Sequence, residues 1–235
     1  MNQADAKFTE SRNGSFLLKA VSLCRSFNVG EAEVPVLRGL SLSIKRNERL
    51  FLSGASGAGK STLLYTLAGL ERPDSGSVII DGKSLYELSS TDQTIFRNEK
   101  IGYVFQNYFL MPDLNAVENV NIPSLIKGGD DNLDRAVDLL KKVGLGERLK
   151  HRPSELSGGE QQRVAIARSL INDPEIIFAD EPTGNLDSST GEGLMETLMK
   201  LVTETNKTLI VVTHDSKLAE LGDRQLVLAD GQIMT

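Results

Sequence analysis

The chain has 235 residues and a net charge of −6 at pH 7, which argues against a general nucleic-acid binder because such proteins carry a basic excess. Its length suits one compact α/β core, and its single cysteine excludes a disulfide framework and is typical of a reducing, cytosolic compartment. No apolar run approaches the length that spans a bilayer, so we expect a chain that is soluble by itself.

The first elements along the chain are a tail and several strands. Residues 1–15 are polar and mixed in charge, and we expect a mobile N-terminal tail there. Apolar stretches at residues 16–23, 40–44 and 77–80 predict strands, the last of which ends at the turn dipeptide Asp81-Gly82. Together they predict a β-rich lobe beside the glycine-rich segment that lies between them in the chain.

That segment, GASGAGKS at residues 54–61, fits G-x-x-x-x-G-K-[ST] and predicts a phosphate-binding loop. It has the context that the motif requires, an apolar strand before it and a helical pattern after it. The glycines let backbone N–H groups face a phosphate, and the helix N-terminus adds the positive end of its dipole. Lys60 would reach the β- and γ-phosphates of ATP, and the Ser61 hydroxyl would bind Mg²⁺. The predicted nucleotide-binding residues of this segment are Gly54, Ala55, Ser56, Gly57, Ala58, Gly59, Lys60, Ser61 and Thr62.

From about residue 89 to 169 the pattern is mainly helical. Apolar residues recur at helical spacing over residues 133–140, and Gly144 follows as a stop. A short strand at residues 101–105 interrupts the helices and leads to Gln106. Strand and helix alternate again after Pro174, which predicts a parallel sheet covered by helices. We therefore expect one nucleotide-binding core with a helical insertion.

Two carboxylates end the apolar run IIFADE. A strand of this kind, buried on both faces, points its end at the ligand-binding edge of a parallel sheet. We expect Asp180 to hold Mg²⁺ and Glu181 to orient or deprotonate the attacking water. Alone, the pair would fit two solvated carboxylates equally well. Its position after a phosphate loop in the chain favours the catalytic role.

A second anion site is predicted where LSGGEQQR precedes an apolar helical run. Ser157 is suited to cap that helix, and the N–H groups of Gly158 and Gly159 at its start would form an anion receptor. On its own the segment would fit an ordinary helix cap.

The three segments GASGAGKS, LSGGEQQR and IIFADE together resemble the ABC transporter family, whose Walker A, signature and Walker B motifs they match in order. The resemblance covers residues 16–235 as a single ATPase domain. It implies an α/β fold in which a P-loop NTPase core, a RecA-like parallel sheet, carries an antiparallel β subdomain and a helical signature subdomain at about residues 89–169.

The resemblance also implies roles for further residues. Phe27 matches the aromatic residue that stacks on adenine, and Gln106 matches the glutamine that senses Mg²⁺ and the γ-phosphate beside the transport partner. Asp187 matches the loop that crosses between two subunits, and His214 matches the switch histidine that contacts the γ-phosphate. The signature would face ATP bound by a second copy of the chain, so that two copies enclose two nucleotides.

Within the family, residues 107–120, 151–156 and 180–187 resemble the branch that contains the lipoprotein-releasing and macrolide-exporter ATPases. Within that branch, residues 88–90 and 97–98 look most like the lipoprotein-releasing subunit. The resemblance thus implies an ATP-hydrolysing subunit, peripheral to the cytoplasmic face of the inner membrane, that acts on separate transmembrane permease subunits to release lipoproteins. A macrolide-type efflux ATPase and a cell-division cassette are the alternatives. Cassettes that act on DNA carry a long coiled-coil insertion, and those that act on ribosomes usually carry two cassettes, so neither group fits.

Overall fold

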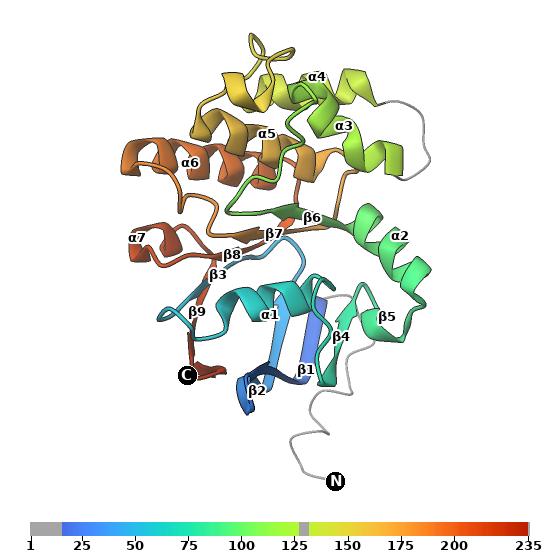
Figure 1. Cartoon of the computed structure of the whole chain (residues 1–235), viewed down its shortest axis with the longest axis vertical. Coiled ribbons are helices and arrows are strands. Elements are labelled where there is room, and N and C mark those ends of the chain that lie inside the picture. Colours follow the sequence, from blue (N-terminus) through green and yellow to red (C-terminus); the bar gives the residue numbers. More distant parts are fainter. Residues whose placement is uncertain (1–15, 127–131, 235) are drawn as a thin grey trace.

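Two β-sheets organise the part of the chain that a computed structural model describes, residues 16–126 and 132–234 (Figure 1). The expected tail at residues 1–15 lies outside this part. The larger sheet has six strands in the order β10-β9-β3-β8-β7-β6, all parallel to their neighbours except β10, which is antiparallel to β9. Its strands are β3 (Arg49–Ser53), β6 (Ile101–Val104), β7 (Ile176–Asp180), β8 (Thr208–Val212), β9 (Arg224–Ala229) and β10 (Gln232–Met234).

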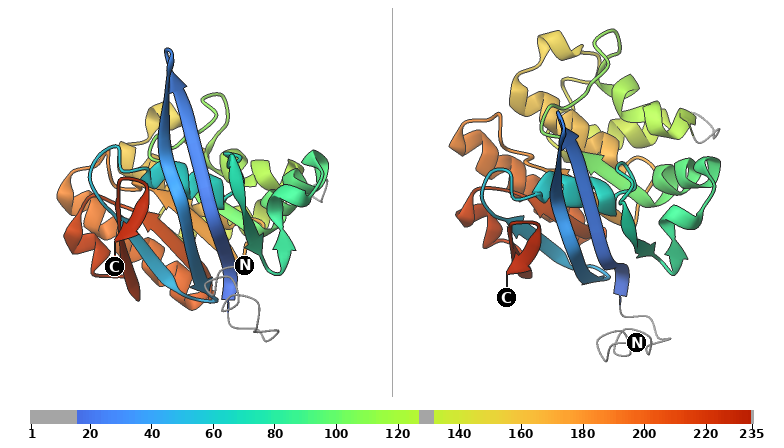
Figure 2. Two further views of the ribbon diagram at one scale, coloured as in Figure 1. Left: turned by 90° about the horizontal axis from the view of Figure 1, so that it is seen from below. Right: turned by 60° about the horizontal axis from the view of Figure 1, so that its bottom comes forward.

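The smaller sheet is antiparallel and has the order β2-β1-β4-β5. Its strands are β1 (Phe16–Val29), β2 (Ala32–Lys45), β4 (Ser75–Ile80) and β5 (Lys83–Ser84). β1 and β2 form a long hairpin whose tip projects beyond the rest of the fold (Figure 2). Residues 16–23 and 40–44 thus form strands as predicted, but both strands extend farther, and β1 carries Phe27 near the tip.

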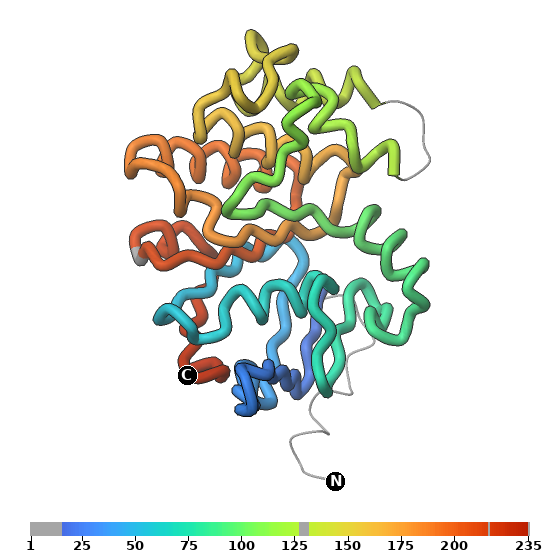
Figure 3. Tube along the Cα trace, in the orientation of Figure 1, coloured from blue at the N-terminus to red at the C-terminus, as the bar shows by residue number. Residues whose placement is uncertain are grey.

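The helices lie on both sides of the larger sheet. α1 (Lys60–Leu67) packs between that sheet and the β1–β2 hairpin, whereas the helical layer with α3, α4, α5 and α6 covers the opposite face (Figure 1). Figure 3 lets the reader follow the chain from β6 of the sheet into this layer at α3 and back to the sheet at β7. The remaining helices are α2 (Ser90–Lys100), α3 (Ala116–Ile126), α4 (Leu133–Lys142), α5 (Gly158–Leu170), α6 (Ser188–Glu204) and α7 (Ser216–Ala219), with short 3₁₀ helices at Leu85–Glu87 and Pro153–Glu155.

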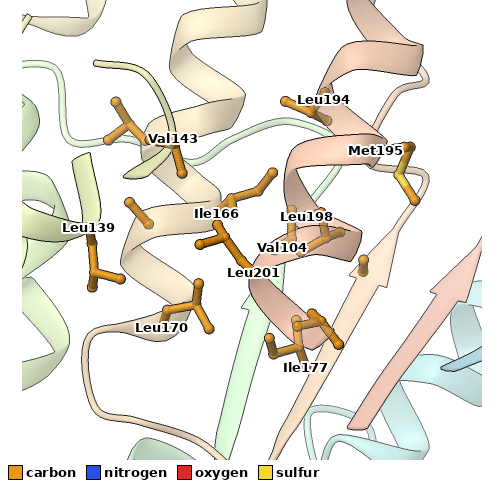
Figure 4. Close-up of a cluster of buried hydrophobic side chains, with 14 of the residues drawn as sticks. Val104, Leu139, Val143, Ile166, Leu170, Ile177, Leu194, Met195, Leu198 and Leu201 are labelled. Atoms are coloured by element: carbon orange, nitrogen blue, oxygen red, sulfur yellow. The ribbon is translucent and has the colours of Figure 1, made fainter. Parts of the chain in front are cut away.

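Each face of the larger sheet has its own hydrophobic core, because successive side chains of a strand point to opposite faces. Ile177 and Ala179 of β7 join the core under the helical layer, and Ile176 and Phe178 join the core with α1 and the hairpin. Figure 4 shows the first of these cores, where Val104 and Ile177 of the sheet meet helical side chains such as Ile166 and Leu198. Because both faces of the sheet are packed, the residues at the carboxyl ends of its strands are held in position.

The predicted fold class is confirmed, including the antiparallel β subdomain and the helical subdomain. None of the helices in the described part of the chain combines the length and the apolar character that crossing a membrane requires.

Candidate functional site

Three neighbouring parallel strands have their carboxyl ends at one cavity. β3 leads into the loop before α1, β7 ends at Asp180, and β8 is followed by His214. Because the order β3-β8-β7 places these carboxyl ends side by side, motifs far apart in the chain meet at one edge of the sheet. The cavity has a volume of about 570 Å³, within the range of small-molecule sites. It is lined by Phe27, Val36, Ser56, Gly57, Gly59, Lys60, Ser61, Thr62, Glu181 and His214.

The loop at residues 54–59 presents backbone N–H groups at the start of α1. Gly59 is the N-cap of this helix, with a φ of 97°, and no side chain caps the helix. The first N–H groups of α1 are therefore not occupied by a cap and can bind an anion. Gly54, Ala55 and Ala58 belong to the loop but are not among the residues that line the cavity.

Lys60 closes the loop on itself. Its side chain is buried, and its Nζ donates hydrogen bonds to the carbonyl oxygens of Gly54, at 3.0 Å, and Ala55, at 2.9 Å. An ammonium group held by two neutral carbonyls lacks a counter-charge among these partners. A phosphate group in the cavity would supply one.

Asp180 faces the phosphate loop from the end of β7. The Ser61 hydroxyl donates a hydrogen bond to its Oδ1 at 3.0 Å. Asp180 is buried, and this burial raises its pKa, although hydrogen bonds from Tyr65 and Ser61 act in the opposite direction. Burial and the nearby Asp180 carboxylate likewise raise the pKa of Tyr65 to about 12.

This hydroxyl and carboxylate fit a Mg²⁺ site. Magnesium is usually held by one or two carboxylates together with substrate phosphates and water, not by an all-protein cage. Consistent with that preference, no group of three or more His, Cys, Asp or Glu residues gathers in the part of the chain that the structure describes. The expected ligands Ser61 and Asp180 are adjacent, and a buried carboxylate beside a phosphate loop has the donor chemistry that the ion requires.

Glu181 lines the cavity one residue beyond β7. Its φ of 42° lies in the left-handed region, which is uncommon for a glutamate and costs on the order of 1 kcal/mol. The backbone N–H of Glu181 donates to the Val212 carbonyl at 3.0 Å, which fixes this conformation. His214 Nδ1 lies 2.9 Å from Glu181 Oε2, so the two predicted catalytic side chains form one pair.

The side chain of Gln106 lies near that of Glu181. A Cβ placed on Gly184 would lie 2.8 Å from Gln106 Nε2 and 3.3 Å from Glu181 Oε2, so both side chains crowd the same glycine. Asn185 Nδ2 donates to the Gln106 carbonyl at 3.0 Å and ties the segment to the chain after β7. Gln106 thus lies beside Glu181 without lining the cavity itself.

The signature segment lies away from this cavity. Ser157 caps α5 through a capping box with Glu160, whose carboxylate accepts the backbone N–H of Ser157 at 2.8 Å, and Ser157 is exposed. Gly158 and Gly159 pack against Tyr108 and Thr190, since added Cβ atoms would lie 2.9 Å from the Tyr108 hydroxyl and 2.6 Å from Thr190 Cγ2. None of these three predicted residues lines the cavity that contains Lys60.

Asp187 is likewise absent from the walls of that cavity. It caps α6, where its carboxylate accepts hydrogen bonds from the Thr190 N–H at 3.0 Å and the Ser189 hydroxyl at 2.7 Å. Hydrogen bonds from the Thr190 side chain, the Thr190 N–H and the Ser189 hydroxyl lower the pKa of Asp187 well below its usual range. One copy of the chain therefore assembles the phosphate loop, the acidic strand end and the Glu181–His214 pair, but leaves the signature and Asp187 outside.

Two further residues of the site were not predicted from the sequence. Val36 lines the cavity opposite Phe27 because of a bulge in the hairpin: Arg25 and Ser26 are adjacent but pair with Leu37 and Pro35, so Val36 is the extra residue. Tyr65 acts on Asp180 from α1. The spacing of four residues between Ser61 and Tyr65 could have predicted this contact, because residues four apart lie on one face of a helix.

A glycine-rich loop between a parallel strand and a helix, with its lysine and a neighbouring acidic strand end, defines the class of P-loop nucleotide hydrolases. Residues 37–184 match the family model described as ABC transporter. The chain belongs to the ABC transporter family, and its enzyme class is ATPase.

Several relatives match nearly the whole chain. It is 45% identical over 223 residues to the lipoprotein-releasing system ATP-binding protein LolD of Shewanella frigidimarina, covering 94% of this chain and 93% of that protein. It is 46% identical over 221 residues to the macrolide export ATP-binding/permease protein MacB of Syntrophobacter fumaroxidans, covering 92% of this chain and 31% of that protein. Among solved structures, the dimeric post-hydrolysis state of the ATP-binding cassette MJ0796, bound to ADP and phosphate, has a TM-score of 0.86 and 42% identity, and covers 93% of this chain and 97% of that one.

Proposed function

We propose that this chain is the ATP-hydrolysing subunit of a lipoprotein-releasing transporter, peripheral to the cytoplasmic face of the inner membrane and bound to separate permease subunits. The observation that carries the hydrolytic part is that Lys60, Glu181 and His214 line one cavity, and that Asp180 is hydrogen-bonded to Ser61 in its wall. The similarity to LolD relatives over almost the whole chain supports the lipoprotein substrate.

On binding ATP, the side chain of Lys60 would exchange its contacts with the loop for contacts with phosphates. The γ- and β-phosphates would replace the Gly54 and Ala55 carbonyls as partners of Lys60 Nζ, which is already positioned in the loop. Ser61, Asp180 and Gln106 would hold Mg²⁺. The chemistry that Mg²⁺ supplies when bound is neutralisation of charge on the two phosphates.

Glu181 would act as the general base. A water oxygen forms a bond to the γ-phosphorus, the bond from that phosphorus to the β–γ bridging oxygen breaks, and Glu181 accepts a proton from the water, which yields ADP and phosphate. The 2.9 Å contact with His214 Nδ1 would orient the Glu181 carboxylate, and His214 itself lines the cavity, where its imidazole would contact the γ-phosphate.

A second copy would complete the site. Because Ser157 is exposed and neither it nor the start of α5 lines the cavity of its own chain, this segment would be free to face the nucleotide of a partner copy. ATP would then join the two copies, and loss of the γ-phosphate on hydrolysis would weaken the contact. That cycle of closing and opening would move the permease subunits.

The permease would contact the segment after Gln106. Phe109 and Met111 there are 60% and 53% exposed and lie two residues apart, and exposed large apolar residues that gather in this way mark a surface for a partner. Arg168 donates hydrogen bonds of 2.6 Å to the carbonyls of Tyr108 and Phe109 and so holds this segment in place.

Glu181→Gln tests the hydrolytic part. The variant keeps the size of the side chain but cannot accept the proton, so it should bind ATP, lose hydrolysis and accumulate as a dimer, as measured by light scattering. Glu196→Gln, on the helix α6 and outside the cavity, is the matched control and should behave as the unchanged chain. A Glu181→Gln variant that stays monomeric and hydrolyses ATP fully would contradict both assignments.

Macrolide-type export is the second candidate, because MacB relatives reach 46% identity over 92% of the chain. The identity of the membrane partner distinguishes release of lipoproteins from export of macrolides. Co-purification of a permease with bound lipoprotein would support release of lipoproteins, whereas a partner whose isolated complex hydrolyses ATP in response to a macrolide and carries no lipoprotein would contradict it.

A further inference from the structure

Arg25 lies against the aromatic ring that is expected to bind the base. Both residues are on β1, two positions apart, and the guanidinium carbon of Arg25 is 4.6 Å from the centroid of the Phe27 ring. Arg25 Nε is buried and has no hydrogen-bond partner among the described residues. The guanidinium therefore contacts the ring directly and uses its other nitrogens for anchoring.

Two carboxylates anchor that guanidinium. Arg25 Nη1 donates to Asp74 Oδ1 at 2.6 Å, and Nη2 donates to Glu71 Oε1. The other oxygen of Asp74 accepts the Ser26 N–H at 2.6 Å, and the Asp74 N–H donates to the Cys24 carbonyl at 2.9 Å. The turn that follows α1 is thus bonded to β1 on both sides of Arg25.

The same turn is tied to the phosphate-binding helix. The backbone N–H of Glu71 donates to the Tyr65 carbonyl at the end of α1, at 3.2 Å. The Tyr86 hydroxyl lies 2.5 Å from the carbonyl oxygen of Thr66 and 2.7 Å from that of Glu71, so its single proton is shared between the helix and the turn. Because α1 begins at Lys60, one rigid connection joins the phosphate loop to the carboxylates that hold Arg25.

The Phe27 ring also lines the cavity, together with Val36 and the phosphate loop. We infer that Arg25, anchored by Asp74 and Glu71, is a positioning residue for the base: it holds the Phe27 ring in the orientation on which the purine of the nucleotide stacks. A ring fixed before binding loses less conformational freedom when the base arrives, and the adjacent cation polarises its π-system. This inference rests on the proposed function, since it assigns a role in ATP binding.

A purely structural role for Arg25 makes a different prediction. An ion pair near the surface contributes little to stability and nothing specific to the base. Arg46 provides a matched control, because it also bridges two carboxylates, Asp81 and Glu175, while no aromatic ring contacts it in the described part of the chain.

The test compares binding of ATP with binding of inorganic tripolyphosphate, which lacks the base, by calorimetry on the whole chain. Arg25→Met should weaken ATP binding by about three- to tenfold and change tripolyphosphate binding by less than about twofold. Arg25→Lys, which keeps the cation, should recover part of the loss. Arg46→Met should change neither affinity.

A second comparison keeps the inference falsifiable if Arg25→Met folds poorly. Asp74→Asn removes the charged anchor of Arg25 and should also weaken ATP more than tripolyphosphate. In a Phe27→Leu background, Arg25→Met should lose most of its effect on ATP, because the arginine acts through the ring.

Equal weakening of both ligands, or unchanged ATP binding in Arg25→Met and Asp74→Asn, would overturn the inference. These outcomes differ from failure of the proposed function, in which the folded, unchanged chain would bind neither ATP nor tripolyphosphate.

Discussion

Replacing Gly54 by alanine tests the geometry of the phosphate loop most severely. Gly54 has a φ of 145°, and an added Cβ would lie 2.1 Å from the carbonyl oxygen of Leu228 in β9. Ordinary contacts of this kind begin near 3.4 Å, so the loop or β9 must move by more than 1 Å. Gly57 is the control in the same loop, since its φ is 78° but nothing lies within 4 Å of an added Cβ.

The two positions separate backbone strain from collision. Gly57→Ala adds only the left-handed strain of an alanine, about 1 kcal/mol. Gly54→Ala adds strain of about 1–3 kcal/mol together with an overpacking cost of about 1–3 kcal/mol. For a domain of this size, about 1 kcal/mol lowers the Tm by about 2–4 °C. We therefore expect a loss of about 2–4 °C for Gly57→Ala and of at least about 5 °C for Gly54→Ala.

Thermal unfolding, monitored by circular dichroism, measures the loss in Tm of each variant. Calorimetry with ATP measures the effect of each substitution on nucleotide binding by the loop. Gly54→Ala should also weaken ATP binding more than Gly57→Ala does, because its displaced backbone carries the carbonyl that positions Lys60. Equal Tm values for the two variants, or a greater loss for Gly57→Ala, would refute the packing of the loop against β9.

Three further predictions concern the metal side, the base and the partner surface. Asp180→Asn should abolish hydrolysis yet raise the Tm of the nucleotide-free chain, because the raised pKa of the buried Asp180 means that its ionisation lowers the free energy of unfolding. The stability of the unchanged chain should accordingly fall as the pH rises from the pKa of an unfolded Asp, about 3.9, through the pKa of folded Asp180. Denaturation measured as a function of pH should not show this fall in the asparagine variant. Phe27→Trp introduces the first tryptophan of the chain, and its fluorescence should change on addition of ATP but not of tripolyphosphate; an identical response to both would exclude stacking of the base. Phe109→Asp should change the rate of ATP hydrolysis by the isolated chain by less than about twofold and should abolish co-purification with the permease. The control variant Leu221→Asp, at an exposed apolar residue near β9, should change neither the rate nor the co-purification. Retention of the permease by Phe109→Asp would contradict the proposed contact.

The strands that carry the motifs could be predicted from the sequence because their chemistry is local. The strands predicted before the phosphate loop and at IIFADE are present as β3 and β7, and β8 belongs to the alternation predicted after Pro174, since each strand centres on an apolar run buried on both faces. Gly144 follows α4 with a φ of 81°, as expected of a residue that ends a helix.

Elements shaped by long-range contacts escaped prediction. β1 continues past Leu23 to Val29 through several register shifts, which break the alternation that marks a strand. β9 and β10 were not predicted, because β9 joins the parallel sheet next to β3 from the far end of the chain and shows mixed burial. Local pattern contains no signal for a partner strand about 170 residues away.

The site was predicted as a set of residues but not as an arrangement. The Glu181–His214 contact depends on the order of β7 and β8 in the sheet, which no motif encodes. The bracing of Phe27 by Arg25 depends on a turn about 50 residues away. The position of Ser157 outside the cavity of its own chain is a property of the fold, and it agrees with the family resemblance, which implies that the signature faces a second copy.

Covalent trapping between two differently marked copies tests the central claim most directly. In a Cys24→Ser, Glu181→Gln background, one copy would carry Ser56→Cys in the exposed phosphate loop and the other Ser157→Cys at the exposed start of α5. If ATP is held between the loop of one copy and the signature of another, mixing the two variants with Mg²⁺ and ATP should give a disulfide-linked dimer on a non-reducing gel, and ADP should not. Failure of the two cysteines to pair with ATP, or equal pairing with ADP, would contradict the account.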